Sequence, residues 1–219
     1  MFRNPADPTS FIRANTRLLT PPLVPEVRLY LAEESLPLWQ RTEDELGQIG
    51  LPPPFWAFAW AGGQALARHV LDHSGLVQGK RVVDLAAGSG LVAIAAMQAG
   101  AESALASDID AFALAAMAMN AAANDVTIGV TQDDLLAAPP PDAEIILVGD
   151  MFYERELAER GLAWLLQCCA RGMDILVGDP GRSYFPKDRF EKVAEHAVPV
   201  TRELEDSEIK RTSVWKLRG

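Results

Sequence analysis

The stretch Val82–Ala96, VVDLAAGSGLVAIAA, joins an apolar strand to an apolar helix through a turn that contains Gly88 and Gly90. Glycines in such a turn let the backbone bend tightly and approach a ligand at the helix N-terminus. A dinucleotide-binding turn reads G-x-G-x-x-G, and in this register its three positions are Ala86, Gly88 and Leu91. A leucine at the last position opposes the close helix–strand packing of that turn, so NAD and FAD are disfavoured as ligands.

Strands and helices alternate on both sides of this turn. We expect strands over 80–85, 101–107, 126–130, 144–149 and 173–178, and helices over 64–72, 90–99, 111–123, 155–170 and 186–196. Strands separated by helices of this length pair in parallel through right-handed crossovers. Two last strands, in 197–204 and 209–217, are joined by the acidic turn at 205–207 and predict an antiparallel hairpin. The fold class is therefore α/β: a Rossmann-like, seven-stranded, mostly parallel sheet with helices on both faces and a C-terminal antiparallel hairpin.

The first 55 residues are proline-rich and break this alternation. In VPEVRLYLAEES, Pro25 suits the first turn of a helix, where its missing N–H costs nothing. The apolar side chains Val27, Leu29 and Leu31 then need a surface to pack on. We expect residues 1–55 to form an N-terminal helical extension or lid packed on the core, and residues 56–219 to form the main domain.

Composition and charge narrow the class of protein. The chain has 219 residues, of which 49% are hydrophobic and 23% charged, and this suits one globular domain. A net charge of −10 disfavours nucleic acid as a partner, because phosphate contacts need clustered Lys and Arg. No apolar run reaches the ~18–20 residues of a membrane span, so we expect no membrane partner.

Cysteine and histidine patterns do not predict a metal site. Cys168 and Cys169 are adjacent within an apolar helical pattern, which indicates core residues in a reducing compartment. His69 and His73 are four apart, but no third ligand is evident, and we interpret them as structural. The expected location is a bacterial cytoplasm. The mitochondrial matrix is the less favoured alternative, suggested by three arginines within the first 17 residues.

The turn fits the pattern D-x-x-x-G-x-G through Asp84, Gly88 and Gly90, and it resembles motif I of class I S-adenosylmethionine-dependent methyltransferases. The resemblance implies S-adenosyl-L-methionine as cofactor and S-adenosyl-L-homocysteine as product. Ala86 replaces the usual first glycine, which fits only if its φ stays below zero. The implied cofactor-binding residues are Trp60, Asp84, Ala86, Ala87, Gly88, Gly90, Asp108, Ile109, Asp133, Asp134 and Leu135. Among them, Asp108 would accept from the ribose hydroxyls, and Asp133 and Asp134 would contact the adenine amino group.

Longer blocks narrow the resemblance. PPFWAFAWAGGQALARHVLD at 53–72, DMFYE at 150–154 and VGDPGR at 177–182 resemble the electron transfer flavoprotein β-subunit lysine methyltransferases over nearly the whole chain. Asp150 to Tyr153 matches the Asp/Glu-x-x-Tyr/Phe motif of the wider group of lysine methyltransferases. The resemblance implies Asp150 and Tyr153 as catalytic residues, with Phe152 and Trp56 as substrate-binding residues. Asp150 could in addition cap the helix that follows it. Arg182 is expected in a solvated loop rather than against an acidic face of the substrate.

The resemblance implies a lysine N-methyltransferase whose partner is a protein with accessible lysines, with the electron transfer flavoprotein β subunit suspected, and we expect a monomer. A ribosomal-protein or a nicotinamide-type small-molecule N-methyltransferase is the alternative within this class. From other classes, an NAD(P)-dependent oxidoreductase and a non-catalytic cofactor-binding module stay open.

Overall fold

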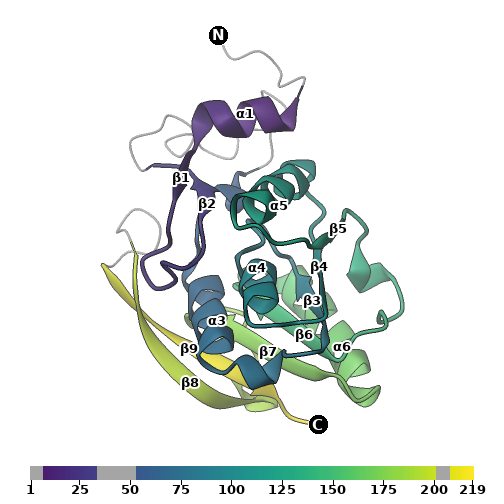
Figure 1. The fold of residues 1–219 in the computed structure, drawn as a ribbon. Helices are drawn as coiled ribbons and strands as arrows, with labels where there is room; N and C mark the ends of the chain where they lie inside the picture. Colours follow the sequence, from purple (N-terminus) through teal and green to yellow (C-terminus); the bar gives the residue numbers. More distant parts are fainter. Residues whose placement is uncertain (1–6, 34–52, 201–207) are drawn as a thin grey trace.

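A computed structural model describes residues 7–33, 53–200 and 208–219. Its centre is one seven-stranded sheet with the order β5-β4-β3-β6-β7-β9-β8 (Figure 1). The strands are β3 Arg81–Leu85, β4 Ser103–Ser107, β5 Gly129–Thr131, β6 Ile145–Gly149, β7 Asp174–Asp179, β8 Phe190–Pro199 and β9 Ile209–Leu217. The first five pair in parallel, whereas β9 is antiparallel to both of its neighbours, β7 and β8. The predicted fold class is confirmed.

Helices cover both faces of the sheet (Figure 1). The helices α3 Ala61–Asp72, α4 Leu91–Gln98 and α5 Ala111–Ala123 lie on one face, and α6 Arg155–Ala170 lies on the other. Single 3-10 turns occur at η1 Phe55–Ala57, η2 Ser74–Leu76, η3 Leu135–Ala137 and η4 Lys187–Arg189. Alternate side chains of β6 enter separate cores, because a strand between two helical layers is buried on both faces. No helix in the described ranges is both long and apolar enough to cross a bilayer.

The helix expected over 186–196 is wrong. After the short turn η4, residues Phe190–Pro199 form strand β8, which pairs with β9 from Phe190↔Leu217 to Pro199↔Ile209. This long-range pairing, with a bulge between Lys192 and Ala194, outweighs the local helical pattern. The predicted hairpin is thus present with a longer first strand, while its acidic turn at 205–207 lies outside the described residues.

The helix expected to begin at Pro25 is also wrong. Leu29–Leu31 forms strand β2, which pairs antiparallel with β1 Arg17–Leu19. The extended backbone also finds a hydrogen-bond partner outside the segment, because the Tyr30 N–H donates to Asn120 Oδ1 at 2.7 Å. The described N-terminal helix is instead α1 Pro8–Asn15, whose first turn is capped by the Asp7 carboxylate.

Described residues before η1 pack on the main domain (Figure 1). The ring of Phe11 in α1 meets Phe112 of α5 edge-on at 5.4 Å between centroids. Asn120 links this segment to the glycine turn, because its amide nitrogen also donates to the Ser89 carbonyl at 2.8 Å. Val27 and Leu29 are fully buried in the same core as α3, α4 and α5. Their burial gives the segment an apolar anchor on the main domain.

Candidate functional site

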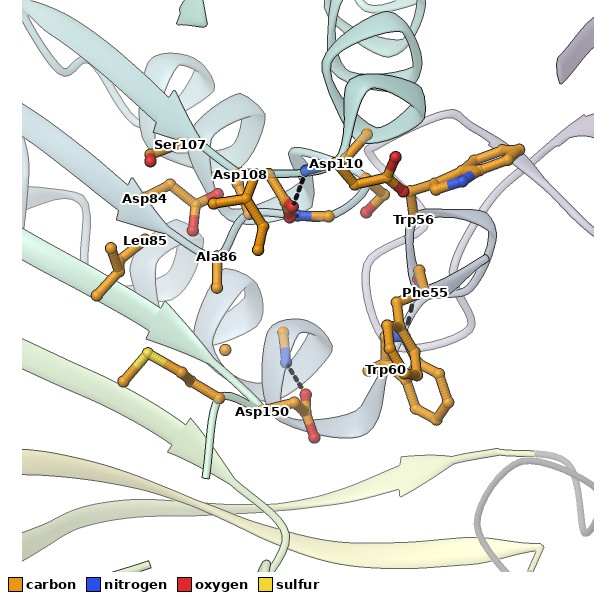
Figure 2. A pocket seen from close by; sticks show the side chains of 18 of the residues that line it. Phe55, Trp56, Trp60, Asp84, Leu85, Ala86, Ser107, Asp108, Asp110 and Asp150 are labelled. Carbon is orange, nitrogen blue, oxygen red and sulfur yellow. Dashed lines mark hydrogen bonds between the residues drawn. The ribbon is translucent and has the colours of Figure 1, made fainter. Parts of the chain in front are cut away.

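A cavity of about 480 Å³ lies beyond the carboxyl ends of β3, β4 and β6. This is the edge at which open α/β sheets bind ligands. Figure 2 shows carboxylates on opposite sides of it and aromatic rings along a third side. Asp84, Asp108 and Asp110 come from the β3 and β4 ends, Asp150 from the β6 end, and Phe55 and Trp60 from the segment leading into α3.

The glycine turn forms one wall of the cavity. Gly90 is the N-cap of α4 with φ 76°, and a Cβ there would lie 3.0 Å from Met117 Cγ, so a side chain would be both strained and crowded. Ala86 has φ 54°, and the expectation of a negative φ is therefore wrong. The turn runs sharply from β3 across the end of β4, where the Ala87 N–H donates to the Ser107 carbonyl at 3.0 Å. Holding alanine in the left-handed region costs roughly 1–2 kcal/mol.

Asp84 is a buried carboxylate beneath the turn. Its Oδ2 accepts from the Ala93 N–H at 2.9 Å and so caps the first turn of α4. Burial raises the pKa of Asp84 to about 7, the charge of Asp108 adds to the rise, and the Ala93 hydrogen bond opposes it. The charged form of Asp84 therefore destabilises the folded protein relative to the protonated form.

Asp108 stands at the end of β4 and fastens the turn to that strand. Its Oδ2 accepts from the Gly88 N–H at 2.9 Å, and its Oδ1 accepts from the Asp110 N–H at 3.1 Å. Burial raises the pKa of Asp108 in spite of these bonds. A carboxylate has about four acceptor positions, so these two hydrogen bonds do not use all of them. The adjoining Ile109 side chain is 70% exposed at the cavity rim.

The two acids after β5 have different surroundings. Asp134 caps η3 through the Leu136 N–H and pairs with Arg160. The Asp133 carboxylate accepts from the Thr131 hydroxyl at 2.8 Å. Both line the cavity together with Leu135, which supplies a mostly buried apolar wall.

Asp150 follows β6 directly and adopts φ 55°, a left-handed conformation that Asp tolerates better than most residues. It does not cap the helix that follows, because α6 begins at Arg155 with Glu154 at its N-cap. Asp150 Oδ2 instead accepts from the Gly63 N–H in the first turn of α3, at 2.9 Å. The expectation that Asp150 caps α6 is therefore wrong. Asp150 caps the first turn of α3, a helix far away in the sequence.

Glycines make this contact possible. A Cβ on Gly62 would lie 2.2 Å from the Gly178 carbonyl oxygen and 2.5 Å from Asp150 Oδ2. A Cβ on Gly149 would lie 3.0 Å from Gly63 Cα. The start of α3 therefore rests directly on the ends of β6 and β7, close to the cavity.

Aromatic residues line the side of the cavity next to Asp150. The Phe55 ring lies 6.1 Å from Trp60 and 5.6 Å from Tyr153, between centroids. The Trp60 indole N–H donates to the Phe55 carbonyl at 2.9 Å, which fixes the orientation of the ring. Tyr153 is 48% exposed and lines the opening. Faces of this kind attract a cationic nitrogen.

Two residues predicted to bind substrate lie deeper. Phe152 is completely buried against Phe185 and Phe190 and is not among the residues that line the cavity. Trp56 lines the cavity but is 2% exposed, and it stacks on Phe112 with 12° between the ring planes. The structure thus brings Asp150, Tyr153 and Trp60 together and leaves Phe152 in the core.

Phe55 and Arg182 line the cavity as well, although the sequence did not single out Phe55 and placed Arg182 in a solvated loop. Arg182 instead pairs with Asp150, its Nη donating to Oδ1 at 2.7 Å. The Pro-Gly turn directly after β7 was the available signal, since it returns the chain toward the carboxyl edge of the neighbouring strand.

The three histidines gather at the far end of α3. The His69 ring lies 4.4 Å from His73 and 6.3 Å from His196, between centroids. Burial, together with the neighbouring histidines, lowers the pKa of His69 to about 4. Within the described ranges, no group of three or more His, Cys, Asp or Glu residues is arranged to hold a metal ion.

Comparisons with known proteins agree with this geometry. The chain is 36% identical over 95% of its length to the electron transfer flavoprotein beta subunit lysine methyltransferase of Xenopus laevis, and it covers 86% of that protein. The human protein of the same name is 33% identical over 94% of this chain, with 80% of its own length covered. Both matches therefore extend over nearly the whole chain.

Ribosomal-protein methyltransferases match a smaller part. The family model described as ribosomal protein L11 methyltransferase matches residues 65–147. The protein of that name from Hahella chejuensis is 39% identical over 51% of this chain, and 38% of its own length is covered. The segment matched by the family model contains the glycine turn and ends before Asp150.

Solved structures share the fold. A ribosomal protein L11 methylase from Lactobacillus delbrueckii superposes with a TM-score of 0.52 at 21% identity, over 74% of this chain and 81% of the other. Magnesium protoporphyrin IX methyltransferase from Synechocystis, solved with bound S-adenosylmethionine, gives 0.54 at 17% identity over 72% and 80%. With the fold of class I methyltransferases and near full-length similarity to curated relatives, the chain belongs to the family of electron transfer flavoprotein β-subunit lysine methyltransferases.

Proposed function

We propose that the chain transfers a methyl group from S-adenosylmethionine to a lysine side chain of the electron transfer flavoprotein β subunit. The observation that carries the proposal is the cavity of about 480 Å³. The glycine turn and Asp108 line one side of it, and Asp150 and Tyr153 line the other. One side has the groups expected for a nucleoside, and the other has those expected for an amine.

The residues on the first side fit the cofactor. Gly88 and Gly90 leave the backbone of the turn unobstructed at the start of α4. The Asp108 carboxylate lines the cavity at the end of β4, where it can accept from the ribose hydroxyls. Ile109 and Leu135 offer apolar surface for an adenine ring, and Asp133, which lines the same cavity, offers a carboxylate acceptor for its amino group. When bound, the cofactor supplies a methyl group made electrophilic by its sulfonium.

The residues on the other side suit a lysine. A carboxylate at Asp150 can accept a hydrogen bond from the amine and direct its lone pair, while Tyr153 and Trp60 shield it from water. The neutral amine nitrogen forms the new N–C bond as the C–S bond breaks, and the electron pair of that bond remains on sulfur. The methylated nitrogen carries the positive charge and then loses a proton to water.

An assay with two protein substrates tests the proposal. Purified chain is incubated with methyl-tritiated cofactor and either electron transfer flavoprotein β subunit or ribosomal protein L11. We expect label on lysine of the flavoprotein subunit and none on L11. Label on L11 alone would favour the ribosomal-protein alternative, and label on neither would contradict the proposed substrate.

Three further assignments accompany the proposal. We infer a reducing compartment, with the cytoplasm ahead of the mitochondrial matrix, and a monomer; the free thiols of Cys168 and Cys169 support the first. We also infer that residues 1–55 act as an extension of the 56–219 domain. The buried Val27 and Leu29 support that division for the described part.

A further inference from the structure

Arg182 and Asp150 form a largely buried ion pair in the cavity wall. Arg182 Nε and one Nη donate to Asp150 Oδ1 at 3.2 and 2.7 Å. The two side chains are 20% and 11% exposed. The guanidinium also lies 5.7 Å from the centroid of the Trp60 ring. A planar cation held by a carboxylate and an aromatic face has a defined orientation.

The local fold fixes the backbone from which Arg182 reaches Asp150. The Asp179 carboxylate at the end of β7 accepts from the N–H groups of Gly181 and Arg182, at 2.6 and 2.8 Å. Gly181 has φ 96°, a conformation that glycine adopts without strain. Since β6 and β7 pair in parallel with Gly149 opposite Gly178, the two loops leave the sheet side by side.

The pair bears directly on the chemistry proposed for the cavity. Methyl transfer needs a neutral amine, but a lone carboxylate stabilises the ammonium form of a lysine beside it. Both Asp150 oxygens are already engaged, Oδ2 by the Gly63 N–H and Oδ1 by Arg182. A lysine arriving there meets an acceptor whose charge is compensated and whose position is fixed.

We propose that Arg182 is a positioning residue for methyl transfer: it neutralises Asp150 so that the carboxylate orients the lysine amine without keeping it protonated. The inference rests on the proposed function and assigns a role to a residue outside the Asp150–Tyr153 motif. The ammonium proton leaves to water before the transfer, and no other reactant is needed.

The other ionisable groups facing the cavity increase the need for such a cation. They are Asp84, Asp108, Asp110, Asp133, Asp134, Tyr153 and Arg160, and Asp179 lies behind the Arg182 loop. Arg160 is engaged by Asp134. Among the described residues that line the cavity, Arg182 is therefore the cation paired with Asp150, in a surround dominated by carboxylates.

The first test compares Arg182→Gln, which removes the charge, with Arg182→Lys, which keeps it. The single-turnover rate on electron transfer flavoprotein β subunit, at saturating substrate and cofactor, is measured against pH and reports the proton state in the bound complex. We expect the apparent pKa of the rate to rise by about one pH unit in Arg182→Gln and to stay near wild type in Arg182→Lys. An unchanged profile in Arg182→Gln would overturn the inference.

The second test does not depend on the identity of the protein substrate. Binding of n-butylammonium to the complex with S-adenosylhomocysteine is measured by calorimetry at neutral pH. We expect Arg182→Gln to bind it about ten-fold more tightly than wild type, because a competing cation has been removed. Tighter butylammonium binding in Arg182→Gln, together with no methylation of the flavoprotein subunit by wild type, would support the role of Arg182 and contradict the proposed substrate.

Two outcomes would reassign Arg182. Equal butylammonium affinity in wild type and Arg182→Gln would show that its charge does not act on the acceptor position. A more than ten-fold loss of S-adenosylhomocysteine affinity in Arg182→Gln, with an unchanged pH profile, would make it a cofactor ligand instead. Melting temperatures of both variants verify that each is folded.

Discussion

Asp150 and Gly63, 87 residues apart in the sequence, are joined by a hydrogen bond of 2.9 Å from the Gly63 N–H to Asp150 Oδ2. The bond fastens the carboxylate at the end of β6 to the first turn of α3. It also places Asp150 within the positive end of that helix dipole, which favours a charged carboxylate there. The orientation of the proposed acceptor group is therefore set by the packing of α3 on the sheet.

The two adjacent glycines of α3 test this packing. In Gly62→Ala, the new Cβ meets the Gly178 carbonyl and the Asp150 carboxylate, so we expect the free energy of unfolding to fall by about 2–4 kcal/mol. Gly63→Ala is the matched control, because its nearest atom is Leu91 Cδ2 at 4.0 Å. Urea melts should show Gly63→Ala unchanged or stabilised by up to about 1 kcal/mol. Equal losses in both variants would contradict the close approach.

Ala86→Gly should stabilise the protein. The backbone of Ala86 is left-handed, and glycine adopts φ 54° without a steric penalty. We expect a gain of roughly 0.5–1 kcal/mol in urea unfolding, after the higher entropy of the unfolded glycine chain is deducted. Ala87→Gly in the same turn has no positive φ to relieve and serves as the control. A loss of stability in Ala86→Gly would mean that Ala86 is not strained.

The raised pKa of Asp84 predicts that the stability of the protein depends on pH. Its folded pKa is raised from 3.8 to about 7, so the folded protein binds the proton more tightly than the unfolded chain. The contribution of Asp84 to stability is full below pH 3.8 and is lost as the pH rises through 7. Asp84→Asn removes the charge and keeps an acceptor for the Ala93 N–H. Its melting temperature should therefore exceed that of wild type at pH 8 and approach it near pH 4; a constant difference would contradict the assignment.

The sequence predicted the parallel part of the sheet because β3, β4 and β6 are short, mostly apolar runs, each followed by an α-helix. It placed a helix over most of β8, whose pairing partner β9 lies further along the chain, and over β2, which pairs with β1 and donates a hydrogen bond to Asn120 on α5. The left-handed Ala86 was missed because alanine seldom adopts that conformation. Asp150 was predicted from its motif, but its partners Gly63 and Arg182 are contacts between distant segments, which periodicity does not reveal.

Asp108→Ala should weaken binding of the cofactor. The variant removes the acceptor proposed for two ribose hydroxyls and also releases the Gly88 N–H that shapes the turn. A loss on the order of 1.5–3 kcal/mol, or about ten- to more than hundred-fold in affinity for S-adenosylhomocysteine, is expected in calorimetry. Glu159→Ala on the exposed side of α6 is the control and should bind as wild type. Unchanged affinity in Asp108→Ala would remove it from the ribose site.

The measurement that bears most directly on the account is the single-turnover methylation rate of Asp150→Asn at saturating cofactor. Asparagine keeps an oxygen for the Gly63 N–H but removes the charge paired with Arg182, so we expect stability to fall by about 1.5–3 kcal/mol with the protein still folded. Loss of the charge should leave S-adenosylhomocysteine affinity within a few-fold and slow methylation of the flavoprotein subunit by about 100-fold. A folded, cofactor-binding Asp150→Asn protein that methylates lysine at the wild-type rate would contradict the role of Asp150 in methyl transfer.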